Sequence, residues 1–125
     1  MINFVTNEII VIENIVYSNL VFMNSLNEKI KIQLKGQLYL TKKSFFIMET
    51  ENSFDLFNKN GEHLKEFSKQ IYNEVFETKE FYRDSENDRL EADDSIILVN
   101  KENDAFICDI RGNLYSIEEE FLKYK

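Results

Sequence analysis

Proline is absent from the 125-residue chain, and glycine occurs only three times. No stretch rich in proline, glycine and serine separates one part of the sequence from another, so nothing marks a linker. The length is close to that of one average domain. We therefore predict a single domain over residues 1–125.

Cysteine is nearly absent as well, since Cys108 is the only one. One thiol cannot form an internal disulfide, and a reducing compartment fits a fold that needs none. The first residues, Met1 to Glu8, lack the basic stretch and apolar run of a secretory signal. The apolar run Ile9–Ile12 is far shorter than the ~20 residues that a membrane span needs. We expect a cytoplasmic protein outside the membrane.

Basic side chains are also scarce, with 15 against 23 acidic ones and a net charge of −8. Nucleic-acid backbones and anionic membranes repel such a surface. We therefore expect no direct nucleic-acid binding and no membrane binding. A basic protein partner is favoured, because electrostatic attraction would steer the encounter. An acidic composition also serves solubility alone, so charge by itself does not decide the function.

Apolar residues, by contrast, are plentiful: 43% of the chain is hydrophobic and 14% aromatic. That supply is typical of a chain with a packed core. The clearest pattern is at residues 29–35, where Ile30, Ile32 and Leu34 alternate with polar residues that are mostly lysines. This period of two predicts a strand with one buried face. Further strands are predicted around residues 9–12, 15–17, 20–23, 37–41 and 45–48.

A weak internal repeat relates two parts of the chain. Residues 44–61 and 95–112 each consist of a strand pattern, a polar turn, a second strand pattern and a turn with glycine. Asn60-Gly61 and Gly112-Asn113 are strong hairpin signals, because both residue types tolerate a positive φ. Meander repeats are typical of β-propeller blades, but two copies are too few for a propeller. We interpret them as two similar hairpins.

The hydrophobic pattern changes its period after Gly61. The apolar residues that follow are Leu64, Phe67, Ile71, Tyr72, Val75 and Phe76. They fall on one face of a helical wheel, which predicts a helix over about 63–78 packed on a sheet. Ser116 and Glu119 resemble a capping box, which predicts a short C-terminal helix. We therefore predict an α+β fold, mostly antiparallel β, with about seven to eight strands in a meander-like curved sheet or sandwich.

The most distinctive segment is an acidic run at residues 84–94, with six carboxylates, one arginine and hence a local charge of −5. In an extended chain residues i and i+2 lie ~6.6 Å apart on one side, so the run would present a row of carboxylates that imitates a polyanion. Aromatic residues just before it would act as anchors. The other interpretation is a solvated loop. The predicted partner-binding residues are Phe81, Tyr82, Asp84, Glu86, Asp88, Glu91, Asp93 and Asp94.

Few residues are candidates for catalysis. His63 is the only histidine and has no cysteine neighbours with which to form a zinc site. An EF-hand does not fit, because Arg89 stands at the glycine position and Ser95 at the glutamate position. A nucleophilic Cys108 would need His63 as its base, whereas a buried inert thiol is the usual case. Phosphate-loop, nucleophile-elbow and zinc-protease motifs are missing. We predict no enzyme, no metal and no cofactor.

Together these properties favour a small acidic binding protein. We expect it to inhibit a basic partner by occluding its substrate-binding cleft, as a bacterial immunity protein or antitoxin neutralises a nuclease toxin. A phage-encoded inhibitor of a host nuclease meets the same physical requirements. A non-inhibitory interaction or scaffold subunit is a further alternative, and its partner surface would be apolar. We expect a monomer or a weak dimer.

Overall fold

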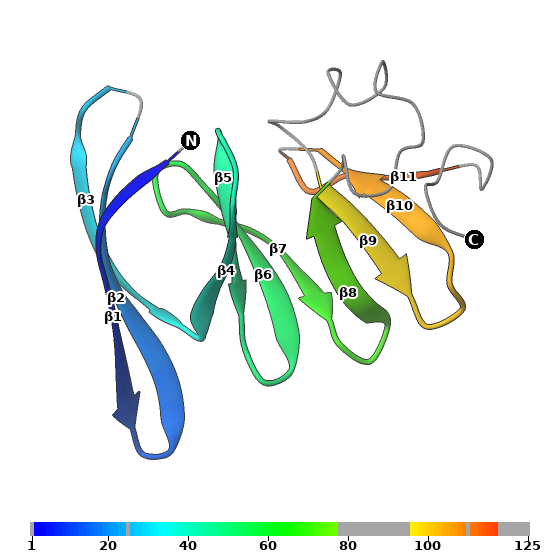
Figure 1. Ribbon diagram of the computed structural model, residues 1–125, viewed down its shortest axis with the longest axis horizontal. Coiled ribbons are helices and arrows are strands. Elements are labelled where there is room, and N and C mark those ends of the chain that lie inside the picture. Colours follow the sequence, from blue (N-terminus) through cyan, green and yellow to red (C-terminus); the bar gives the residue numbers. More distant parts are fainter. Residues whose placement is uncertain (1, 25, 78–95, 110, 118–125) are drawn as a thin grey trace. The chain divides into compact units, whose positions relative to one another are not determined.

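The computed structural model describes residues 2–24, 26–77, 96–109 and 111–117. All regular structure within these residues is β, with eleven strands in three antiparallel sheets and no helix. Figure 1 labels the strands and colours them along the chain. The chain divides into two compact units, Met1–Phe67 and Ser68–Lys125. A single domain over 1–125 stays a prediction.

The first sheet consists of β1 (Asn3–Ile12), β2 (Ile15–Met23) and β3 (Lys29–Lys35), in that order. A two-residue turn joins β1 to β2, and both of its residues, Glu13 and Asn14, have a positive φ. That backbone is the one a tight hairpin turn requires. β3 shows the predicted alternation of half-buried and exposed side chains. The strands predicted at 15–17 and 20–23 are one strand, β2.

The second sheet also belongs to the first unit. Its strands are β4 (Gln37–Thr41), β5 (Phe45–Glu49), β6 (Ser53–Asn58) and β7 (His63–Ser68). The first and second sheets share a core that contains Phe22 and Phe46, both fully buried, and the half-buried Phe4. The ring centroids of these three residues lie 5.0–5.5 Å apart. Clustered aromatic rings of this kind contribute both buried area and favourable edge-to-face geometry.

The third sheet forms the second unit. Its strands are β8 (Tyr72–Glu77), β9 (Ile96–Asn100), β10 (Ala105–Cys108) and β11 (Leu114–Ser116). Ile97, Val99 and Ala105 form a small core to which Phe76 and Ile107 contribute. The second and third sheets are both four-stranded meanders. The two copies of the repeat correspond to the antiparallel hairpins β5–β6 and β9–β10, each of which is part of a four-stranded meander.

Four hairpin turns share one design. The side-chain oxygen of the first turn residue accepts the backbone N–H groups of the residues two and four places later. The fourth residue has a φ between 59° and 87°, which asparagine and glycine tolerate best. The first and fourth residues of these turns are Asn24 and Asn27, Asn58 and Gly61, Asn100 and Asn103, and Asp109 and Gly112.

The predicted helix over 63–78 is wrong, because the described part of this segment forms β7 and β8. Ser68 begins a turn between them: its carbonyl accepts the N–H of Ile71, and its hydroxyl accepts the N–H of Gln70. Val75 and Phe76 are neighbours on opposite faces of β8, yet both are at least half-buried. Strands covered on both faces carry apolar residues at odd and even positions, which imitates helical spacing.

The predicted α+β class is therefore corrected to all-β, and seven to eight strands become eleven in three sheets. The predicted C-terminal helix also fails where it can be compared. Ser116, its expected cap, is the last residue of β11 and pairs with Phe106. The next residue, Ile117, donates its N–H to the carbonyl of Ala105 and so continues a β-type contact. Residues 118–125 lie outside the described part of the chain.

Candidate functional site

The acidic run lies outside the described residues. The same holds for the whole predicted partner-binding set, Phe81, Tyr82, Asp84, Glu86, Asp88, Glu91, Asp93 and Asp94. The proposed row of carboxylates therefore stays a prediction from the sequence. Other candidates among the described residues are His63 and Cys108, a pocket beside Gly36, and the hairpin of β1 and β2.

The two residues considered for nucleophilic chemistry belong to different units. His63 lies on β7, and its exposed ring packs edge-on against Phe57 at a centroid distance of 5.2 Å. Cys108 is buried on β10, where its thiol donates to the carbonyl oxygen of Asp109 at 3.4 Å. A buried thiol in a strand behaves as a small apolar side chain. Within the described ranges, no group of three His, Cys, Asp or Glu side chains is arranged to hold a metal ion.

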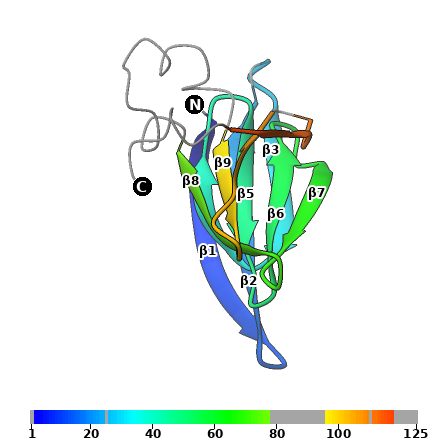
Figure 2. The same cartoon turned by 90° about the vertical axis from the view of Figure 1, so that its right-hand side faces the viewer.

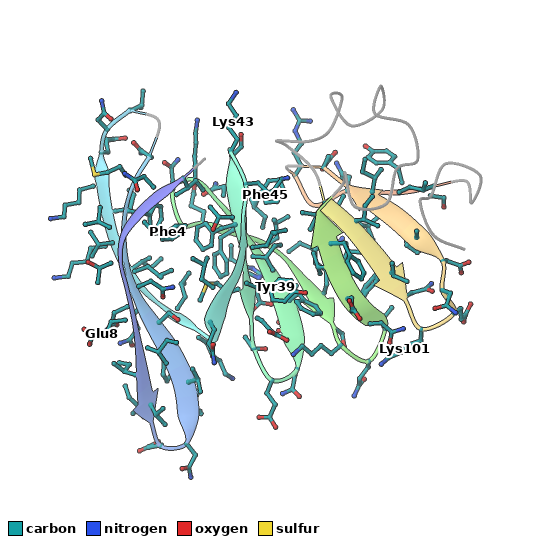
Figure 3. The ribbon with its side chains drawn as sticks, in the orientation of Figure 1. Phe4, Glu8, Tyr39, Lys43, Phe45 and Lys101 are labelled. Atoms are coloured by element: carbon teal, nitrogen blue, oxygen red, sulfur yellow. The ribbon has the colours of Figure 1, made fainter. Side chains whose placement is uncertain are left out.

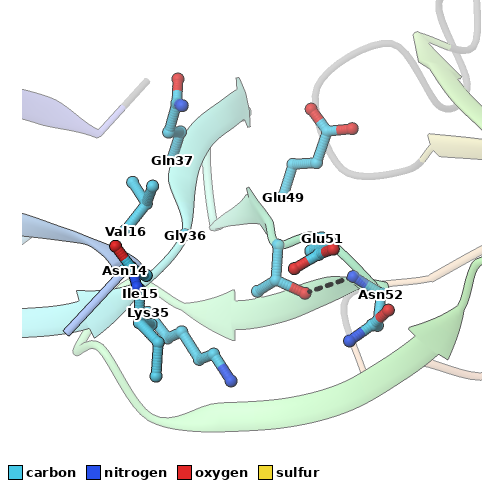
Figure 4. A pocket seen from close by; sticks show the side chains of 10 residues that line it. Asn14, Ile15, Val16, Lys35, Gly36, Gln37, Glu49, Glu51 and Asn52 are labelled. Atoms are coloured by element: carbon cyan, nitrogen blue, oxygen red, sulfur yellow. Dashed lines mark hydrogen bonds between the residues drawn. The ribbon is translucent and has the colours of Figure 1, made fainter. Parts of the chain in front are cut away.

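An open pocket of about 360 Å³ lies in the first unit (Figure 4). Three chain segments line it: the turn before β2, the β3–β4 junction at Gly36, and the β5–β6 turn. At the junction, the N–H of Gly36 donates to the carbonyl of Val16 at 2.8 Å, and its own carbonyl accepts the hydroxyl of buried Ser18 at 2.7 Å. These bonds fix the point where the chain passes from the first sheet to the second.

The pocket has a mixed lining, with one lysine, Lys35, and two glutamates, Glu49 and Glu51. A chain of hydroxyl contacts runs from its wall into β6: Thr50 lies 2.8 Å from the Ser53 hydroxyl, which donates to Asp55 at 3.0 Å. No hydrogen bond among the described residues joins Ser53 to His63, so these side chains do not form a catalytic triad. The contacts are those of a polar turn.

Two aspartates differ in the direction of their pKa shifts. Burial raises the pKa of Asp55, and Glu66 adds to this, while the Ser53 hydroxyl, His63 and Lys35 oppose it. Partial burial tends to raise the pKa of Asp109, but the hydrogen bonds from Asn113, Arg111 and Tyr115 lower it by more. The pKa of Asp109 is therefore below its ordinary value of 3.8, and that of Asp55 is above it.

We predict opposite pH dependence for two asparagine substitutions. A raised pKa contributes stability below pH 3.8 that is lost as the pH rises through the folded pKa. The stability of Asp55→Asn relative to the wild type should therefore increase toward neutral pH. A lowered pKa contributes stability above pH 3.8 that is lost as the pH falls through the folded pKa. The stability of Asp109→Asn relative to the wild type should therefore decrease toward neutral pH. Urea unfolding midpoints between pH 2 and 7 measure both differences. If the unfolding midpoints of both variants, relative to the wild type, changed with pH in the same direction and by the same amount, this account would be contradicted.

The hairpin of β1 and β2 is the most exposed apolar element of the first unit. Its strands continue beyond the last residue paired with β3, since Tyr17 pairs with Lys35 and the hairpin runs on to Glu13. Figures 1 and 2 show its tip beyond the other strands of this unit. Five large apolar side chains on it are 36–64% exposed: Val5, Ile9, Val11, Ile12 and Ile15.

Charge is scarce on this hairpin and has one sign. Between Asn3 and Met23 the only charged side chains are Glu8 and Glu13. In Figure 3, Phe4 points into the interior of the first unit, whereas Glu8 points away from it. Exposed apolar residues scattered singly are ordinary, but several of them on one hairpin with few charges are typical of a protein interaction surface. Residues 3–17 therefore form the candidate site, here called the apolar hairpin.

Comparison with known proteins adds no relative: no family model, curated protein or solved structure matches the chain. In the described ranges, no helix has the length and apolar character that a membrane crossing demands.

Proposed function

We propose that this chain binds another protein through the apolar hairpin. The observation that carries the proposal is the exposure of Val5, Ile9 and Val11, each more than half exposed, on one strand without a lysine or arginine. Burial of apolar area drives most protein association, at roughly 25 cal/mol per Å². A partner that covers these side chains would therefore gain stability in the complex.

The partner that we propose is basic. The net charge of −8 and the two glutamates of the apolar hairpin attract a positively charged surface and repel nucleic acid. We further propose that binding occludes the substrate cleft of a nuclease, as in an immunity protein or antitoxin, or in a phage-encoded inhibitor. This function involves no catalytic step by the chain. A reducing cytoplasm suits it, because the lone Cys108 is buried and forms no disulfide.

One observation favours a second candidate, a non-inhibitory interaction subunit. The apolar hairpin carries only two charges, so its interface would depend more on buried area than on electrostatic steering. Salt distinguishes the candidates. Association with a basic nuclease should slow steeply between low and high ionic strength, whereas docking onto an apolar subunit surface should hardly respond. A basic nuclease-like reading frame beside the gene would support the inhibitor.

We predict that amides in place of the six carboxylates of the acidic run weaken partner binding by roughly tenfold or more. The reason is the local charge of −5, which a cationic surface would neutralise. The measurement is the dissociation constant for a partner captured from the native cell and identified by mass spectrometry. The variant should keep its melting temperature. The substituted residues are Asp84, Glu86, Asp88, Glu91, Asp93 and Asp94.

A matched control removes the same number of charges elsewhere. If both variants weaken binding equally, total charge acts and the acidic run has no special role. If neither does, the basic-partner proposal fails. The control replaces six exposed glutamates by glutamine: Glu28, Glu51, Glu62, Glu66, Glu74 and Glu102.

A further inference from the structure

Among the described residues, no strand pairs with the outer edge of β1, so backbone groups there can pair with another strand. β1 lies at the edge of the first sheet. In a hairpin with a two-residue turn, the residues beside the turn form a hydrogen-bonded pair, and such pairs alternate along the strands. Ile12 and Ile15 are that first pair. By this alternation Asn7, Ile9 and Val11 direct their N–H and C=O groups away from β2.

A hydrogen bond on the other side of β2 supports this assignment. Val16, which lies opposite Val11, directs its carbonyl away from β1 and accepts the N–H of Gly36 at 2.8 Å. Val11 and Val16 are thus a pair that does not exchange hydrogen bonds, as the alternation requires. The backbone of Val11 is therefore turned toward the open side of the sheet.

The two edges of the first sheet differ in their protection. β3 carries three exposed lysines, Lys29, Lys31 and Lys35, and lysine on an edge strand discourages pairing with other chains. β1 has no lysine, arginine or proline. Its one irregularity is a bulge between Phe4 and Thr6, which leaves the rest of the strand in regular register with β2. Within the described part of the chain, one edge of this sheet is therefore protected and the other is open.

We propose that β1 accepts an extended segment of a basic partner protein as a fourth strand of the first sheet. The inference rests on the proposed function and adds its binding mode. Main-chain hydrogen bonds to Asn7, Ile9 and Val11 hold the segment, and alternate side chains give specificity. Apolar residues of the segment pack beside Ile9 and Val11 on one face, and its basic residues lie on the face that carries Glu8.

Charge identifies the occupant. Glu8 lies on the face of β1 that carries Ile10 and Ile12, so a lysine or arginine directly opposite or diagonal to it forms a favourable cross-strand pair. A second copy of this chain would bring another Glu8 and a net charge of −8 to the same edge, which opposes self-association. The segment that fits is therefore apolar with interspersed basic residues.

The test uses a synthetic seven-residue peptide of alternating valine and lysine with blocked ends, added to the full ¹⁵N-labelled chain. We expect saturable NMR shifts at the amides of Asn7, Ile9 and Val11. The same peptide methylated on alternate backbone nitrogens should not bind, because it lacks the donors that a strand needs. Equal binding of the methylated peptide, or shifts that avoid β1, would overturn the inference.

A charge reversal gives a second readout. Glu8→Lys should weaken the binding of the lysine peptide by roughly threefold or more and strengthen the binding of a peptide with glutamate in place of lysine. The control Glu51→Lys changes the net charge equally but lies in the exposed β5–β6 turn, so it should leave the difference between the peptides unchanged. An equal response of both variants would show general charge attraction and overturn the placement of the segment beside Glu8.

Three outcomes separate this inference from the proposed function. If sedimentation shows that the chain alone dimerises with the same amide shifts, the occupant is a second copy and the basic segment is wrong. If a captured basic partner responds to the acidic-run amides but not to Glu8→Lys, the edge inference fails while the function stands. If the peptide pairs with β1 but no basic partner exists, the proposed function fails and the strand-binding edge stands.

Discussion

Phe46→Ala is expected to destabilise the first unit by about 3–5 kcal/mol. Phe46 is fully buried and contacts three other rings. It stacks on Phe57 at 5.3 Å with an interplanar angle of 13°, and it meets Phe4 and Phe22 edge-on at 5.3 and 5.5 Å. Alanine loses the buried area and leaves a cavity that the two sheets cannot fully close. Urea unfolding followed by circular dichroism measures the loss.

Phe46→Leu is the matched control for size. Leucine keeps most of the volume and removes only the ring geometry, so we expect a loss of about 1–2 kcal/mol. A second control, Val5→Ala, trims a side chain that is 63% exposed and should change the stability by less than ~0.5 kcal/mol. If Phe46→Ala cost no more than Phe46→Leu, the aromatic cluster would not be the core of this unit.

Gly36→Ala is expected to cost roughly 3 kcal/mol or more. Gly36 has a φ of 95°, a region that disfavours residues with a Cβ. An added Cβ would clash with the carbonyl group of Glu49, approaching its carbon to 2.9 Å. The clash is with backbone and not with a side chain that can turn away. The junction between β3 and β4 would have to shift, with loss of the bonds to Val16 and Ser18.

Gly61→Asn separates the effect of φ from that of the clash. Gly61 also has a positive φ, but the atom closest to an added Cβ is the side-chain Cδ1 of Ile32 at 3.3 Å. Asn27 and Asn103 occupy the same position in two of the other turns of this design. We therefore expect a cost below ~1 kcal/mol. A similar loss for both glycines would mean that close approach at Gly36 contributes nothing.

The local features of the strands could be predicted from the sequence, but the helix could not be excluded. Alternation at residues 29–35 identifies β3, and Asn60-Gly61 identifies a turn, because both patterns depend only on neighbouring residues. Leu64, Phe67 and Val75 fit a helical face because spacing alone does not show which strands are covered on both sides. The hydroxyl and carbonyl of Ser68 close a turn there, and this signal is weak in the sequence.

The candidate site was only partly accessible to sequence analysis. The acidic run stands out by composition, and its role is still a prediction. The apolar hairpin was overlooked, although its run Ile9–Ile12 without alternation was visible. Such a run ordinarily indicates a strand buried on both faces. Its exposure became apparent only from the register, which carries β1 and β2 past the end of β3.

The meander order of the three sheets has a kinetic consequence. Every described strand is hydrogen-bonded only to the strands that come directly before or after it in chain order. Closing a short loop costs little chain entropy, and proteins with local contacts fold faster than those that must first bring distant segments together. The chain should therefore refold faster than β-sandwiches of similar length in which distant strands pair, since the paired strands can form as hairpins, except β8 and β9, which residues 78–95 separate.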